Sequence, residues 1–137
     1  MDKIVVDTNI VFSSLLGNHK IIEFLMCENN RLFVPKIFFV EMFVHKEKLT
    51  KISKLSLNEV NEFLLLITKN LIVIDERLIP ENLKSKALEL VEDIDIKDLP
   101  FIALSLYLDA KILTGDKKLI NGLKNKGFKN IIELKEL

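Results

Sequence analysis

The sequence predicts one α/β domain in which helices cover both faces of a mostly parallel five-stranded sheet, a three-layer α/β/α sandwich. The first observation is length, because 137 residues suit one compact domain and are few for two. The second is that short β-branched runs alternate with segments whose apolar residues repeat at helical spacing, which favours parallel strands covered by helices. The third is that no linker, repeat or low-complexity stretch divides residues 1–137, so we expect a single domain.

The first half of the chain is typical of two strands and three helices. The run "KIVV" is short, β-branched and apolar, as buried strands are. A break near Gly17 separates two helical segments, and Pro35 is suited to open a third. In chain order we expect a strand over 3–6, helices over 9–16 and 20–29, a strand over 31–34, and the helix that follows Pro35.

The second half repeats the alternation. Apolar residues at helical spacing predict helices, and the short apolar runs "LIVI", "KILT" and "IIEL" predict strands. In chain order we expect a helix over 58–69, a strand over 71–74, helices over 81–92 and 98–109, a strand over 111–114, a helix over 117–124, and a strand over 131–134.

Composition limits the classes of protein that fit. Hydrophobic residues make up 49% and charged residues 29%, which is typical of a soluble, well-packed domain. Lys plus Arg and Asp plus Glu are both 20, so binding to nucleic acid would have to depend on a local basic patch. A single cysteine excludes an internal disulfide and a cysteine metal site. Without a signal peptide or a run long enough to span a bilayer, we expect a cytoplasmic protein that does not bind a membrane.

Four carboxylates fall where the predicted strands end. Asp7 directly follows the first strand, Asp116 follows the fourth, Asp98 begins the helix before the fourth, and Glu41 lies in the second turn of the helix after the second. The carboxyl ends of parallel strands meet at one edge, so Asp7 and Asp116 would project there, and Glu41 could. Carboxylates gathered in this way repel unless a cation or protons neutralise them. Oxygen ligands of this kind suit Mg²⁺ or Mn²⁺.

Three of these carboxylates also have a structural interpretation. Asp7, or its neighbours Thr8 and Asn9, could cap the following helix, because Asp and Thr are common N-caps. Asp98 stands before Leu-Pro at a helix start and makes a good N-cap. Asp116 follows a glycine and could be a turn and cap residue.

Glu41 is harder to explain as a structural residue. It interrupts "IFFVEMFV", in which no rotation of a helix obviously places the carboxylate in bulk water. The structural alternative is a buried ion pair with a lysine or arginine. Four separate structural roles at one sheet edge are a less economical explanation than one shared role.

Three segments carry a further resemblance: "IVVDTNIVFSSLL", "VPKIFFVEMFV" and "IDIKDLPFIALSLYLDAKILTGDKKL". In this order they resemble the acidic segments of the PIN domain family, the fold of metal-dependent ribonucleases that includes VapC-type toxins. The resemblance extends over essentially the whole chain. It implies a five-stranded parallel sheet between helices and often a dimer.

The resemblance also implies roles for individual residues. The acidic cluster that holds Mg²⁺ or Mn²⁺ would consist of Asp7, Glu41, Asp98 and Asp116. The neighbours that hydrogen-bond to these carboxylates and orient them would be Thr8, Asn9 and Thr114. Asp95 lies three residues before Asp98 and could share or replace its role.

We therefore predict an endoribonuclease in which one or two divalent ions activate a water molecule, with RNA as substrate and an antitoxin as a possible protein partner. The basic stretches 45–54 and 117–129 could hold phosphates or could be solvated helix faces. The histidines lack metal-ligand spacing, and the phenylalanines of 38–43 are expected in the core. The alternative is an inactive PIN-like module that binds RNA or protein. The segment "DTN" lacks the second aspartate of aspartyl phosphatases, and no Gly-rich phosphate loop follows a strand.

Overall fold

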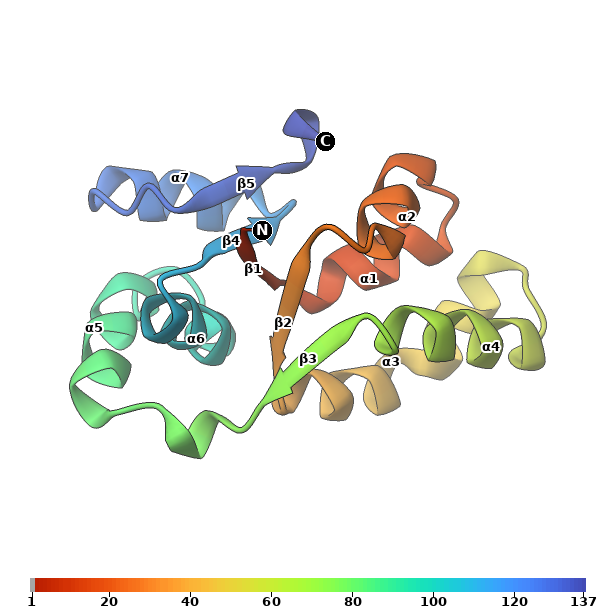
Figure 1. Cartoon of the computed structure of the whole chain (residues 1–137), viewed down its shortest axis with the longest axis horizontal. Coiled ribbons are helices and arrows are strands. Elements are labelled where there is room, and N and C mark those ends of the chain that lie inside the picture. Colours follow the sequence, from red (N-terminus) through yellow and green to blue (C-terminus); the bar gives the residue numbers. More distant parts are fainter. Residues whose placement is uncertain (1) are drawn as a thin grey trace.

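Five parallel strands form one sheet in the order β3-β2-β1-β4-β5 (Figure 1). The computed structural model of the chain describes residues 2–137. Each neighbouring pair of strands is parallel, so the carboxyl ends of all five lie at one edge of the sheet. The strands are β1 (Lys3–Val6), β2 (Arg31–Pro35), β3 (Leu71–Ile74), β4 (Lys111–Thr114) and β5 (Ile131–Glu133).

Helices connect the strands and cover the sheet. The α-helices are α1 (Thr8–Leu15), α2 (His19–Met26), α3 (Ile37–Ser53), α4 (Leu57–Thr68), α5 (Glu81–Val91), α6 (Leu99–Leu108) and α7 (Lys117–Asn125). Short 3₁₀ turns are η1 (Glu76–Leu78), η2 (Ile96–Asp98) and η3 (Leu134–Glu136). Among residues 2–137, no helix combines the length and the apolar composition needed to cross a membrane.

Two hydrophobic clusters lie on opposite faces of the sheet. Ile4 and Val6 of β1 belong to one cluster and Val5 to the other, because successive side chains of a strand point to opposite faces. Helices α1 to α4 pack on the first face and α5 to α7 on the second, as the two groups of helices in Figure 1 show. The predicted three-layer α/β/α sandwich is confirmed.

Most element boundaries agree with the sequence prediction, but Pro35 does not open a helix. It is the last residue of β2 and pairs with Ile74 of β3, while α3 begins at Ile37. Proline has no N–H to donate, yet it can close a strand because its carbonyl oxygen is still available. The predicted strand over 131–134 likewise ends one residue early, because Leu134 begins the turn η3.

The phenylalanines of 38–43 are not all in the core, and the sequence prediction is wrong for one of them. Phe38 is fully buried, and Phe39 packs edge-on against it with ring centroids 5.3 Å apart. Phe43 is 77% exposed. Only one side of α3 faces the sheet, and a segment that is apolar all round has no polar face to show which side that is.

Candidate active site at the carboxyl edge of the sheet

Asp7 and Thr114 meet where the two central strands end. Val6 of β1 pairs with Leu113 of β4, which places the next residue of each strand side by side. The Thr114 hydroxyl donates a hydrogen bond to Oδ2 of Asp7 at 3.0 Å, and both side chains are buried. The predicted contact between Thr114 and an acidic residue is therefore present.

Asp7 immediately precedes α1, but its side chain makes no well-formed capping hydrogen bond to that helix within residues 2–137. Burial raises the pKa of Asp7, and the hydrogen bond from Thr114 opposes part of that rise. The nearby backbone N–H groups of Asn9 and Thr8 also lower the pKa, whereas the negative charge of Asp116 raises it.

Asp116 is linked to the same hydrogen-bonded group. Its backbone N–H donates to the Thr114 hydroxyl oxygen at 3.1 Å, which leaves the hydroxyl proton for Asp7. Oδ1 of Asp116 accepts a hydrogen bond from the Leu119 N–H at 3.2 Å and caps α7. The structural interpretation of Asp116 is thus present, and it occupies one of the two carboxylate oxygens.

Glu41 enters the same region from α3. The Thr8 hydroxyl donates to Oε1 of Glu41 at 3.3 Å, so α1 contributes a donor beside Asp7. Burial raises the pKa of Glu41, the Thr8 hydrogen bond lowers it, and the negative charge of Asp7 raises it again. His45 and Lys97 act in the opposite direction through their charge.

The ion pair considered for Glu41 is not present in the described part of the chain, where no lysine or arginine lies within ion-pair distance of it. The helix around Glu41 is also more exposed than its composition suggests, with Val40 at 54% and Val44 at 67%. An open groove of ≈ 430 Å³ runs beside Glu41 between α3 and the start of α6. The groove is lined by Ile37, Val40, Glu41, Val44, His45, Ile96, Lys97, Leu99 and Pro100.

Asp98 has the most strained electrostatic environment of the four carboxylates. Burial raises its pKa to about 7, and the neighbouring negative charges of Asp7, Asp95, Asp116 and Glu41 add to that rise. Its Oδ2 atom is buried and has no hydrogen-bond partner among residues 2–137. Although Asp98 precedes α6, its side chain caps nothing in that helix within the same residues.

Asp95 and Asn9 lie at the margin of this group. Oδ1 of Asp95 accepts a hydrogen bond from the Lys97 N–H at 3.0 Å and caps η2, so its side chain serves the turn that presents Asp98. Asn9 is exposed and, in the part of the chain that the structure describes, makes no side-chain hydrogen bond to any of the four carboxylates. It lines a groove that also contains Asp116.

The carboxylates influence one another electrostatically without forming a closed ligand set. Within residues 2–137, no three Asp, Glu, His or Cys side chains are arranged to hold a metal ion as they stand. The donors nevertheless suit a hard divalent cation, because they are all oxygens and because the unpartnered Oδ2 of Asp98 lacks a positive neighbour. A cation at this edge would relieve the repulsion that raises the pKa of Asp98.

Sequence reasoning missed two residues near the site. Lys97 is close enough for its charge to lower the pKa of Glu41. Glu76 accepts hydrogen bonds from the backbone at the start of α3, the helix that carries Glu41. Glu76 is far from α3 in the sequence, so no local sequence pattern predicts its hydrogen bonds with that helix.

Comparisons with known proteins agree with the fold. A family model described as "PIN domain" matches residues 5–135. Among solved structures, VapBC2 from Rickettsia felis bound to a DNA fragment from its promoter is similar, with a TM-score of 0.66, 18% identity and 96% of each chain covered. A toxin–antitoxin complex from Klebsiella pneumoniae is also similar, with a TM-score of 0.60, 15% identity, and 93% of this chain and 94% of that chain covered. No match is found among curated protein sequences.

Proposed function

Because the chain belongs to the PIN domain family, a family of nucleases, we propose that it is an Mg²⁺- or Mn²⁺-dependent endoribonuclease that hydrolyses phosphodiester bonds of RNA. The observation that supports this most strongly is the environment of Asp98. Its buried Oδ2 has no protein partner within residues 2–137, and three other proposed site carboxylates raise its pKa. Such an arrangement gives the domain no stability by itself, whereas a bound cation would compensate for it.

In the proposed mechanism Asp7, Glu41, Asp98 and Asp116 would hold the divalent ion, directly or through water. Such an ion would supply Lewis-acid activation of a water nucleophile and compensation of charge on the phosphate and the leaving oxygen. The protein orients the carboxylates through donors that each anchor one oxygen. These donors are the Thr114 hydroxyl on Asp7, the Thr8 hydroxyl on Glu41 and the Leu119 N–H on Asp116.

The RNA strand would leave the acidic edge along the start of α7. Two grooves of ≈ 330 and ≈ 470 Å³ adjoin there and share Gly115 and Leu134. Asp116 lines the first groove, and Lys117 and Lys135 line the second. A Cβ on Gly115 would lie 2.7 Å from Cδ1 of Leu134, so a larger residue here would require the Leu134 side chain to move.

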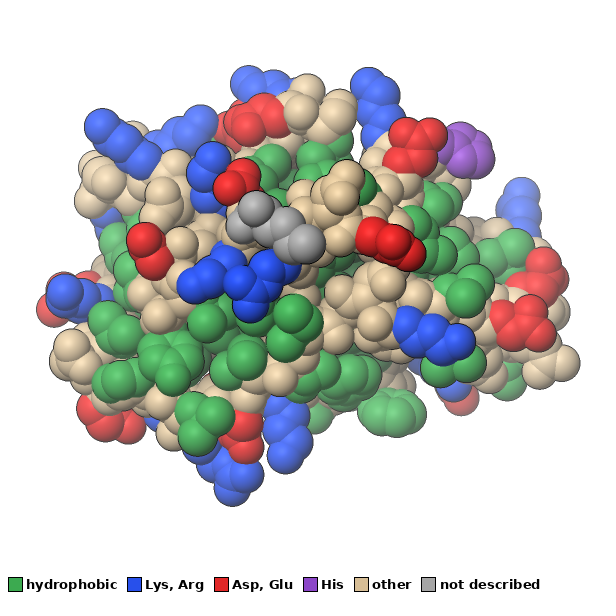
Figure 2. Space-filling view, viewed as in Figure 1, with side chains coloured by type: hydrophobic (Ala, Val, Ile, Leu, Met, Phe, Trp, Pro, Cys, Tyr) green, Lys and Arg blue, Asp and Glu red, His purple; other side chains and the backbone are tan. Residues whose placement is uncertain are grey.

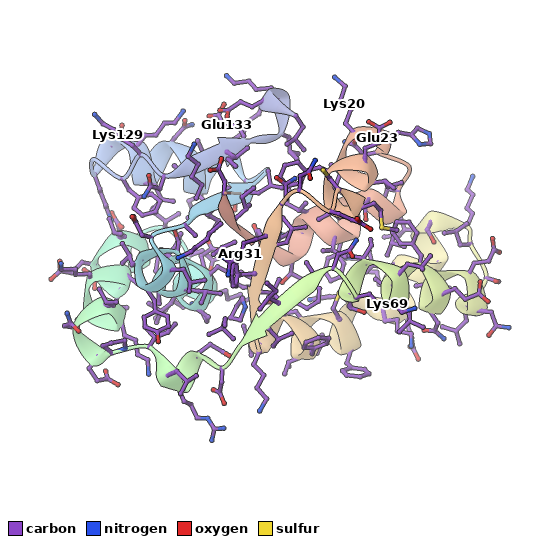
Figure 3. The ribbon with its side chains drawn as sticks, viewed as in Figure 1. Lys20, Glu23, Arg31, Lys69, Lys129 and Glu133 are labelled. Carbon is purple, nitrogen blue, oxygen red and sulfur yellow. The ribbon has the colours of Figure 1, made fainter. Side chains whose placement is uncertain are left out.

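Several of the lysine side chains near α7 already form ion pairs with carboxylates. Figure 2 shows basic and acidic side chains intermixed over one face, and Figure 3 labels Lys129 and Glu133 in the part formed by α7 and β5. Lys124 and Lys135 both bind Glu133, at 2.8 and 3.1 Å. Lys117, the first residue of α7, has no ion-pair partner among residues 2–137, so we assign it to an RNA phosphate beside Asp116.

The toxin–antitoxin neighbours extend the proposal to partners. We infer that the protein is the toxin of such a pair and that a protein antitoxin binds it. A cytoplasmic location and a homodimer accompany this proposal, through the family resemblance. The exposed apolar side chains of α3, Val40, Phe43 and Val44, supply a surface that a protein partner would cover.

Cleavage of RNA tests the proposed function. Purified protein should cut mixed RNA with Mn²⁺ or Mg²⁺ and stop when a chelator is in excess. Asp98→Asn should lose most of this activity, because it removes a charge from the ion site while keeping the shape. Asp109→Asn is the matched control, because Asp109 lies at the other end of α6 and its left-handed φ of 50° is tolerated by asparagine.

Three results would count against a metal-dependent nuclease. Cleavage that continues in chelator, or that survives Asp98→Asn, would remove the ion from the mechanism. Retention of RNA without any cleavage would instead support the alternative, an inactive PIN-like binding module.

A further inference from the structure

The amino-terminal end of α3 is held by a carboxylate that is distant in the sequence. Oε2 of Glu76 accepts a hydrogen bond from the Ile37 N–H at 3.2 Å. Oε1 accepts one at 2.6 Å from the Lys36 N–H, which also donates to the Ile74 carbonyl oxygen at 3.1 Å. N–H groups at a helix start lack partners within the helix. The local cap residue, Lys36, provides no side-chain cap, so Glu76 takes over that function from across the fold.

Glu41 depends on this end of α3 for its position. It follows Ile37 by four residues, which places the two side chains one above the other on the same side of the helix. Of the 17 residues of α3, only Phe38, Met42 and Leu49 are buried. Ile37 and Phe39 are partly buried against the two hydrophobic clusters, so packing holds one side of the first two turns. Glu41 itself has only a long hydrogen bond from Thr8, at 3.3 Å, so the hydrogen bonds at the start of the helix help to fix its position.

The turn that supplies Glu76 is itself fixed. Oδ1 of Asp75 accepts a hydrogen bond from the Arg77 N–H at 3.0 Å, and the Arg77 guanidinium binds the same carboxylate with an Nη2–Oδ2 distance of 2.7 Å. These contacts hold the pKa of Asp75 well below its usual range. At the end of the turn, Ile79 is buried in the cluster that contains α6.

Glu76 thus connects the two helical layers at the site. Helix α3, which carries Glu41, lies in the layer of α1 to α4, and Ile79 anchors η1 in the layer of α6, which follows Asp98. From these contacts we propose that Glu76 is a positioning residue for Glu41. The part of this proposal that concerns metal and RNA depends on the proposed function, whereas the part that concerns the position of Glu41 does not.

The protein offers a matched control in a second capping glutamate. Oε1 of Glu59 accepts a hydrogen bond from the Ser56 N–H at 3.1 Å and completes a capping box at the start of α4. Helix α4 carries none of the four carboxylates. Glu76→Ala and Glu59→Ala therefore remove the same chemistry from two helix ends, only one of which leads to the site.

The first measurement uses the metal-free protein. We expect Glu76→Ala to shift the side-chain carboxyl ¹³C resonance of Glu41 and to speed hydrogen exchange at the amide of Ile37, whereas the amide of Lys36 keeps the Ile74 carbonyl as an acceptor. Glu59→Ala should change neither. Glu76→Gln keeps one acceptor oxygen and should recover part of the protection, and it serves as the second variant if Glu76→Ala fails to fold.

The second measurement adds Mn²⁺ and RNA. Loss of an outer partner that orients a metal ligand commonly weakens affinity or rate by about 10- to 100-fold, so we expect Glu76→Ala to weaken Mn²⁺ binding and kcat about tenfold with little change in KM. Glu59→Ala should leave all three unchanged. An unchanged Glu41 resonance in Glu76→Ala, or equal effects of the two variants on Mn²⁺ affinity, would overturn the positioning role. Failure of the wild type to bind Mn²⁺ would instead overturn the proposed function.

Discussion

Asp98 shows most clearly how a single residue gains its properties from its surroundings. In sequence it resembles an N-cap, because it stands before a helix that begins Leu-Pro. In the fold its side chain caps nothing within residues 2–137, and one carboxylate oxygen is buried without a partner. Burial and neighbouring negative charges make ionisation of this carboxyl unfavourable, so its protonation should be coupled to folding.

The pH dependence of stability tests this coupling. The pKa of Asp98 rises from 3.8 to about 7 in the folded chain, so the folded state is favoured while Asp98 is protonated, below its unfolded pKa. That contribution is lost as the pH rises from about 4 to about 7 in metal-free protein. Because the side chain is partly exposed, solvent screening reduces the effect to about 1–2 kcal/mol. Asp98→Asn should show a shallower fall in unfolding free energy over this range.

Denaturant unfolding of the wild type and Asp98→Asn at several pH values, with a chelator present, provides the measurement. The two proteins should have similar stability near pH 4, and the variant should be the more stable near pH 8. Parallel curves would show that Asp98 titrates as an ordinary exposed carboxyl.

At the scale of one element, α7 shows that a residue can cap a helix and face the site at once. Asp116 caps α7 through Oδ1, and its N–H binds the Thr114 hydroxyl. Asparagine has a side-chain oxygen that can cap equally well, whereas alanine has none. Substitution of Asp116 by asparagine removes only the negative charge, whereas substitution by alanine also removes the cap of α7.

We expect Asp116→Asn to leave metal-free stability unchanged or slightly higher, because the cap remains and repulsion falls. Asp116→Ala should cost about 1 kcal/mol through loss of the cap. Chemical denaturation of the metal-free variants measures both effects. A marked loss in Asp116→Asn would mean that the negative charge itself stabilises α7.

Secondary structure was predictable from sequence wherever local pattern decides it. The strands over 3–6, 71–74 and 111–114 have the predicted bounds, because short β-branched runs flanked by polar residues are unambiguous. Helix α3 was harder to place. The exposure of Phe43 and the hydrogen bonds from the start of the helix to Glu76 both depend on how the helix lies on the sheet. Neither feature produces a periodic pattern in the sequence.

The site was predictable to a similar degree. Parallel topology alone brings Asp7 and Asp116 to one edge, and this follows from strand order. The donors that orient the carboxylates come from packing between elements, such as Thr8 of α1 on Glu41 of α3. Only the family resemblance, and no pattern in the chain itself, indicated those donors in advance.

Over the whole molecule, the four carboxylates of the proposed site gather at the carboxyl edge of the sheet. The formal net charge is zero, and the face in Figure 2 shows both signs intermixed, with hydrophobic side chains gathered over α5 and α6. In the proposed function, contact with RNA would therefore be local, beside Asp116 and Lys117. The two layers of helices contribute different carboxylates, since Glu41 comes from α3 and Asp98 precedes α6. A cation between them would hold the layers together.

Titration of Mn²⁺ into metal-free wild type and Glu41→Gln, combined with chemical denaturation, tests whether Glu41 belongs to a divalent-cation site. Glutamine keeps the size of Glu41 and an oxygen for the Thr8 hydroxyl, so the variant should be as stable as the wild type. The wild type should bind Mn²⁺ saturably, and the variant should bind it about tenfold more weakly or worse. Unchanged Mn²⁺ affinity in Glu41→Gln would remove Glu41 from the metal site. Absence of Mn²⁺ binding by the wild type would contradict the metal site altogether.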